Sequence, residues 1–136
     1  MRIVLDTNIA ISGMLWSGRP QQLFDQAQDG MLRLYTCRAL LDELMDVLNR
    51  PKLVDALAQR RVRPRQLLQY YESLCMSVKP APVGRIVPAD PDDDIVIACA
   101  IGAKAGYIVT GDLPLRSMGK YKGIKIVSAG EMMDLL

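Results

Sequence analysis

Hydrophobic residues along the chain fall into two kinds of pattern. Short apolar runs bounded by turn-forming residues predict strands, and apolar residues at helical spacing over longer stretches predict helices. The expected strands cover residues 3–5, 32–36, 75–79, 106–110 and 123–127. The expected helices cover residues 7–14, 20–28, 37–49, 51–61, 64–75 and 91–104, and a short helix closes the chain. Because strands alternate with helices, the pattern predicts an α/β protein with a mainly parallel central sheet covered on both faces.

Two acidic residues follow predicted strands. Asp6 comes directly after the run IVL, and Asp112 follows GYIVT with only Gly111 between. In open parallel sheets, ligands bind just beyond the carboxyl ends of the strands, so both carboxylates are expected at a site. The alternative for Asp6 is a helix N-cap, and for Asp112 a turn residue after glycine.

The helix expected at 91–104 begins with several acids, of which one lies on an apolar stripe. Asp94 shares this stripe with Ile97, Ala98 and Ile101, at the i+3, i+4 and i+7 positions. A carboxylate that faces the core is costly unless a metal ion or another cation compensates its charge. We therefore expect Asp94 to face a site.

The acids next to Asp94 have a simpler explanation. Asp90 fits the N-cap position and Pro91 the first helical position. Asp92 and Asp93 would then stabilise the positive end of the helix dipole.

An acid also lies on the amphipathic helix expected at 37–49. Glu43 is at the edge of its apolar stripe, beside Leu40 and Val47. From this pattern alone, a surface acid is the simpler interpretation of Glu43, and a ligand is the alternative.

Composition sets the class of protein. The chain has 136 residues, half of them hydrophobic, which predicts a single domain over residues 1–136. No apolar run approaches the roughly 20 residues that cross a bilayer. The N-terminus MRIVLDTN resembles neither a signal nor a transit peptide. Cys37, Cys75 and Cys99 are widely spaced among apolar residues, and this predicts reduced core thiols in a cytoplasmic protein.

Histidine is absent from the sequence. Mechanisms that need an imidazole base, a Ser-His-Asp triad or a histidine-rich zinc site are therefore excluded. Hydrolysis would have to depend on carboxylates, hydroxyls and a hard divalent cation, which prefers oxygen ligands.

The net charge is only +2, but basic residues are concentrated between positions 50 and 65. A basic flank near an acidic pocket suits a polyanionic substrate, although a solvated surface is the simpler alternative. The residues expected to contact the phosphates of such a polyanion are Arg60, Arg61, Arg63 and Arg65.

Four segments, in their order and spacing, resemble the PIN domain family: VLDTNIAIS, LLDELMDVLNRPK, DPDDDIVIACAIGAKAGYIVTGD and GIKIVSAGEMMDLL. The resemblance covers essentially the whole chain and is strongest to the bacterial branch described as toxins of toxin–antitoxin modules. It implies a three-layer α/β/α sandwich and a metal-dependent endoribonuclease. An antitoxin protein and a second copy of the chain are the partners that it implies.

The resemblance also assigns roles to residues. Asp6, Glu43, Asp94 and Asp112 would be the acidic ligands of Mg²⁺ or Mn²⁺. Asn8 and Thr110 match polar positions that line the family's site. One departure is that Pro114 and its neighbours replace an acid that many relatives carry after TGD.

Three other classes of protein are weighed against this one. A haloacid dehalogenase-type phosphatase needs a second acid two residues after Asp6, where this chain has Asn8. A response-regulator receiver would open with paired acids, which are absent here. A non-catalytic relative that binds nucleic acid or a partner is the remaining alternative, and the complete set of four acids argues against it.

Overall fold

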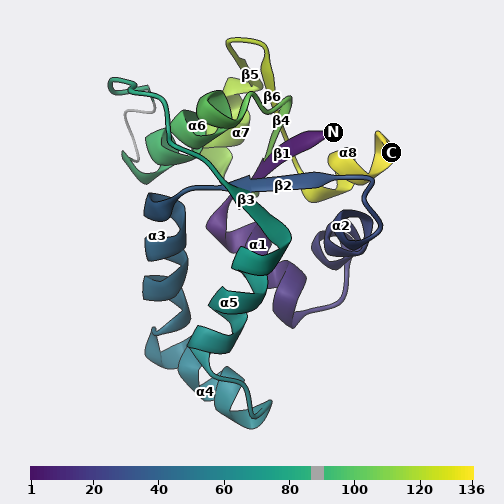
Figure 1. Cartoon of the computed structure of the whole chain (residues 1–136), viewed down its shortest axis with the longest axis vertical. Helices are drawn as coiled ribbons and strands as arrows, with labels where there is room; N and C mark the ends of the chain where they lie inside the picture. Colours follow the sequence, from purple (N-terminus) through teal and green to yellow (C-terminus); the bar gives the residue numbers. More distant parts are fainter. Residues whose placement is uncertain (87–90) are drawn as a thin grey trace.

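The computed structural model describes residues 1–86 and 91–136 of the chain. The strands are β1 (Arg2–Leu5), β2 (Arg33–Thr36), β3 (Cys75–Ser77), β4 (Tyr107–Val109), β5 (Lys120–Tyr121) and β6 (Ile124–Val127). The helices are α1 (Thr7–Leu15), α2 (Arg19–Gln28), α3 (Arg38–Leu48), α4 (Pro51–Gln59), α5 (Pro64–Leu74), α6 (Pro91–Ala103), α7 (Leu113–Met118) and α8 (Ala129–Asp134). Their arrangement is shown in Figure 1.

The strands form one six-stranded sheet in the order β3-β2-β1-β4-β6-β5. All neighbours pair in parallel except β5 and β6, which form an antiparallel hairpin at one edge. The chain moves outward from β1 through β2 to β3, and then returns to β4 on the other side of β1. In β1, Ile3 pairs with Leu34 of β2 and with Tyr107 of β4. The strand order therefore reverses between β1 and β4, and such a switch point is where open α/β sheets bind ligands.

Side chains of β1 alternate between two hydrophobic cores. Ile3 and Leu5 pack on one face of the sheet with residues of α1, α2, α5 and α8. Val4 packs on the opposite face with residues of α6 and α7. Successive strand residues point to opposite faces, so one sheet can hold both cores. The predicted α/β class and three-layer sandwich are confirmed.

Two short elements near the end of the chain were not predicted. Helix α7 begins after Asp112, whose side chain accepts a hydrogen bond from the backbone N–H of Leu115. The β5–β6 hairpin turns at Lys122 and Gly123, which both have positive φ angles, as this type of tight turn requires. Both elements are too short for a periodic pattern to indicate them.

The cysteines are free thiols, as predicted. Cys37 and Cys99 are fully buried in the core that contains α6, and Cys75 is half-buried. The hydrogen bond that Cys99 donates to Cys37, together with burial, raises the pKa of Cys99. Within the described residues, no helix combines the length and the hydrophobicity needed to cross a membrane.

Candidate active site

An acidic cavity of about 210 Å³ lies beyond the carboxyl ends of β1 and β4. It is formed by the start of α1, the middle of α3, the turn before α4, the first turn of α6 and the N-cap of α7. The lining residues are Asp6, Thr7, Asn8, Glu43, Val47, Arg50, Asp92, Asp93 and Asp112. The cavity is thus at the switch point of the sheet, where Asp6 and Asp112 were expected to meet.

Asp6 is held rigidly between α1 and β4. It is the N-cap of α1, and its Oδ1 accepts a hydrogen bond of 2.8 Å from the backbone N–H of Thr7. Its Oδ2 accepts a hydrogen bond of 2.6 Å from the hydroxyl of Thr110. Its own backbone N–H donates to the carbonyl of Val109 at 2.9 Å. Asp6 is therefore the N-cap of α1 and lines the cavity at the same time.

Thr110 connects two acids of the cavity without lining it. This residue is fully buried, and its hydroxyl donates to Asp6 and accepts a 3.0 Å hydrogen bond from the backbone N–H of Asp112. Asn8, by contrast, is exposed and lines the cavity directly. The sequence placed both residues near the site, and the structure assigns Thr110 a supporting position.

Glu43 reaches the cavity from the middle of α3 and is half-buried. Its Oε2 accepts a hydrogen bond of 2.9 Å from the hydroxyl of Thr7. Thr7 therefore contacts two acids, since its backbone N–H also donates to Asp6. Of the two interpretations left open for Glu43, this arrangement favours a ligand over a solvated surface acid.

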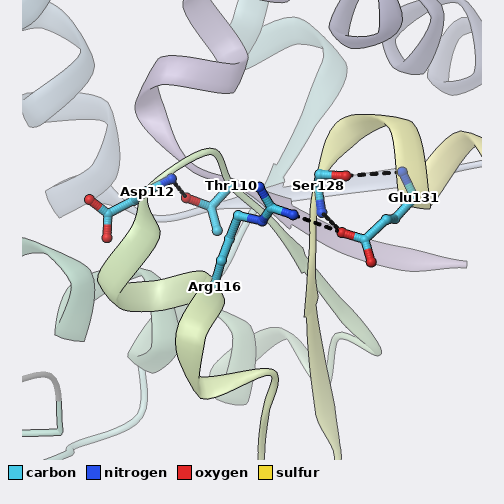
Figure 2. Close-up of polar contacts among 5 residues, drawn as sticks. All are labelled: Thr110, Asp112, Arg116, Ser128 and Glu131. Atoms are coloured by element: carbon cyan, nitrogen blue, oxygen red, sulfur yellow. Dashed lines mark hydrogen bonds and ion pairs between the residues drawn. The ribbon is translucent and has the colours of Figure 1, made fainter.

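Asp112 is half-buried at the N-cap of α7 and lines the cavity from the other side. Figure 2 shows its carboxylate pointing away from Arg116. Arg116 instead forms an ion pair of 3.2 Å with Glu131, which also closes the capping box of α8 with Ser128. Hydrogen bonds from Ser128 lower the pKa of Glu131. Arg116 therefore pairs with an acid of α8 and not with Asp112.

The acids of α6 are arranged differently from the sequence expectation. Asp94 lies outside the cavity lining, where its Oδ1 accepts a 3.1 Å hydrogen bond from the backbone N–H of Ile86 and its Oδ2 lies 3.5 Å from Arg85. Asp93 and Asp92 line the cavity instead. Asp93 is only 4% exposed, and Asp94 is 8% exposed. The structure thus brings Asp93, and not Asp94, to the other acids.

The physical reason is that α6 is buried on more than one side. The stripe that starts at Asp93 continues through Val96, Ile97 and Ala100, all no more than 1% exposed. The stripe chosen from the sequence ends at Ile101, which is only half-buried. Since apolar residues surround nearly the whole helix, periodicity could not distinguish two adjacent stripes. The expected N-cap at Asp90 lies outside the described residues.

The four arginines expected to contact RNA lie at the junction of α4 and α5, outside the cavity lining. Arg60 already has partners within the chain: it donates a hydrogen bond to the carbonyl of Leu15, and its guanidinium lies 5.9 Å from the ring centre of Trp16. Arg61, Arg63 and Arg65 are exposed. The basic residue that does line the cavity is Arg50, which sequence reasoning did not assign to the site.

The donor chemistry of the cavity suits a hard divalent cation. Carboxylates from α1, α3, α6 and α7 line it, and oxygen is the ligand that Mg²⁺ and Mn²⁺ prefer. Across residues 1–86 and 91–136, however, no three acidic or cysteine side chains are already grouped closely enough to hold one ion.

The PIN domain family model matches residues 2–114, from the first residue of β1 to the start of α7. The chain belongs to the PIN domain family. The matched region of this PIN domain contains every acid of the cavity. PIN domains are in general nucleases that use divalent metal ions.

No curated protein matches this PIN domain closely enough to identify a relative. A solved structure of VapBC2 from Rickettsia felis, bound to a DNA fragment from their promoter, has a similar fold. The two superpose with a TM-score of 0.60 over 93% of this chain and 97% of that chain, at 15% sequence identity. At this identity the similarity supports the fold of the PIN domain.

Proposed function

We propose that this PIN domain is a metal-dependent endoribonuclease that hydrolyses RNA phosphodiester bonds in the acidic cavity. The observation that carries the proposal is the convergence of acids from separate elements on one small cavity at the switch point. Membership of a family that consists in general of nucleases supports the reaction class. The resemblance to bacterial ribonuclease toxins favours RNA as the substrate.

Asp6, Glu43, Asp93 and Asp112 are the residues that would hold Mg²⁺ or Mn²⁺, with Asp93 in the place first expected for Asp94. When bound, such a cation lowers the pKa of water and neutralises charge on the phosphate. Asn8 would contact metal-bound water or the phosphate at the exposed rim.

Two threonines orient the acids for this role. Thr7 donates to Asp6 through its backbone and to Glu43 through its hydroxyl. Thr110 fixes the second oxygen of Asp6 and receives the backbone N–H of Asp112. Each carboxylate oxygen has two lone pairs, so an oxygen that accepts one of these hydrogen bonds can still bind a cation.

The test compares two adjacent acids of α3. Glu43→Gln removes a cavity carboxylate, and Asp42→Asn removes an exposed acid that pairs with Arg38. With an end-labelled RNA pool and Mn²⁺, we expect Glu43→Gln to lose at least about 100-fold in cleavage rate and Asp42→Asn to match the wild type. Chelator should abolish cleavage by all three proteins. Full cleavage in chelator, or equal rates for both variants, would contradict the proposal.

We further propose that the nuclease acts as the toxin of a toxin–antitoxin module. The similarity in fold to VapBC2, solved in a complex with promoter DNA, supports this role. Expression of the wild-type chain should then arrest growth, and co-expression of the antitoxin should restore it. The homodimer and the cytoplasmic location stay predictions, and light scattering of the purified chain tests the first.

A further inference from the structure

Arg50 is held beside the acids by the geometry of α3. Glu43, Val47 and Arg50 occupy positions i, i+4 and i+7, and all three line the cavity. The backbone N–H of Arg50 donates to the carbonyl of Val47 at 3.1 Å, which continues the helical path past the end of α3. Pro51 then favours an extended conformation at Arg50, which has φ −66° and ψ 142°. Arg50 therefore lines the cavity from the turn between α3 and α4.

Among the described residues that line the cavity, Arg50 is the one cation beside five acids. In the part of the chain that the structure describes, the ion pairs join Arg19 to Asp134, Arg38 to Asp42, Arg85 to Asp94 and Arg116 to Glu131. Arg50 takes part in none of these. Arg50 therefore lines an acidic cavity while no carboxylate of the described residues forms an ion pair with it, and its donors are available to a ligand.

A metal ion held by the acids would repel the Arg50 guanidinium, because both are positively charged. An anion bound between the metal ion and the guanidinium would attract both. A phosphodiester has two non-bridging oxygens, and guanidinium binds such a pair through parallel hydrogen bonds. We propose that Arg50 binds the non-bridging oxygens of the RNA phosphodiester and presents it to the metal-binding acids. This inference rests on the proposed function.

The lining of the cavity suits a phosphate better than a base. Among the described residues, its lining is charged or polar except for Val47 and includes no aromatic side chain on which a base could stack. Arg50 is therefore expected to contact the RNA backbone and not the base, and its loss should weaken binding of all RNA sequences alike.

The test uses Arg50→Ala and Arg50→Lys, with Lys52→Ala as the matched control. Lys52 is exposed two residues away and does not line the cavity. For cleavage of end-labelled RNA in Mn²⁺, we expect Arg50→Ala to lower kcat/KM about 10- to 100-fold, as for a lost charge-assisted hydrogen bond. Arg50→Lys should recover part of this loss, since it keeps the charge without the planar fork. Lys52→Ala should match the wild type.

A second readout separates phosphate binding from a structural role. Calorimetric titration with Mn²⁺ alone should show that Arg50→Ala binds the metal as tightly as the wild type or more tightly, because a repelling charge is gone. Weaker Mn²⁺ binding in proportion to the lost cleavage, or an unchanged kcat/KM, would overturn the inference.

Should Arg50→Ala not fold, Arg50→Lys decides by the same criteria. Absence of cleavage by the wild type would overturn the proposed function as well, whereas wild-type cleavage with unchanged Arg50 variants counts against Arg50 alone.

Discussion

At the scale of single residues, hydroxyl groups organise the acids of the cavity. Thr110 is fully buried, and its hydroxyl joins the carboxylate of Asp6 to the backbone of Asp112. Thr7 connects Asp6 and Glu43 in the same way, because its backbone N–H donates to Asp6 and its hydroxyl donates to Glu43. Neighbouring carboxylates repel one another, and these hydrogen bonds offset part of the repulsion by stabilising the ionised acids. The threonines are therefore part of the site although they carry no charge.

Replacing Thr110 with valine tests this point, because valine keeps the shape and removes the hydroxyl. We expect the free energy of unfolding to fall by about 1–3 kcal/mol and RNA cleavage to fall with it, since both hydrogen bonds are lost inside the protein. Thr110→Ser keeps the hydroxyl and should recover most of the cleavage. Urea denaturation and cleavage rates measure the two effects. A valine variant as active as the wild type would show that Thr110 does not position the acids.

At the scale of elements, the accuracy of sequence interpretation depended on how each element is buried. The acids after β1 and β4 both line the cavity, because the end of a parallel strand fixes where the residues after it lie. The sequence of helix α6 is ambiguous because the helix is buried nearly all round, so Asp93 and Asp94 both head apolar stripes. The acid that lines the cavity, Asp93, is the neighbour of the residue predicted from the sequence, Asp94.

The arginines of α4 and α5 also divide into two kinds. Arg60 ties the end of α4 to the end of α1 through Leu15 and Trp16, whereas Arg61 and Arg65 are exposed. The charge pattern could not reveal this difference, because it depends on where α1 ends in space.

We expect Arg60→Ala to lower the free energy of unfolding by about 1 kcal/mol. A double Arg61→Ala, Arg65→Ala variant should leave stability nearly unchanged and weaken RNA binding, with a salt dependence flattened by about 0.7 per lost phosphate contact. Thermal melts and fluorescence titrations at several salt concentrations check both. An unaltered salt dependence in the double variant would assign these arginines to the solvated surface.

At the scale of the whole molecule, one sheet supports two cores, and this architecture was predictable. Alternating strands and helices indicated a parallel sheet covered on both faces, and the two clusters on either side of β1 confirm it. The strand order was not predictable from residues alone, because it depends on which side of β1 the chain returns to after β3. The presence of Arg50 in the cavity depends on the same long-range packing.

Buried titratable groups are expected to make the folded state less stable at high pH. Burial raises the pKa of Cys75 from 9.0 to about 12 and raises the pKa of Tyr71 well above 10.0. Above about pH 9 the unfolded chain releases protons that the folded chain retains, so the free energy of unfolding should fall as the pH rises toward 12. Cys75→Ala should reduce this slope by up to about 1.4 kcal/mol per pH unit. Urea denaturation between pH 8 and 11 measures it, and an identical slope in the variant would contradict the assignment.

The central claim is that Asp93 belongs to a metal-binding catalytic cavity and that Asp94 does not. It is tested most directly by thermal melts of the wild type, Asp93→Asn and Asp94→Asn, each in chelator and in saturating Mn²⁺. A bound metal stabilises the folded state by about 2.7 kcal/mol at a hundred times Kd.

Without metal, Asp93→Asn should melt at or above the wild type, because it relieves repulsion among the acids. It should gain little from Mn²⁺. Asp94→Asn should melt below the wild type, since it weakens the contacts to Arg85 and Ile86, yet gain as much from Mn²⁺ as the wild type does. If Mn²⁺ instead stabilises Asp93→Asn fully and fails to stabilise Asp94→Asn, the cavity described here is not the metal site.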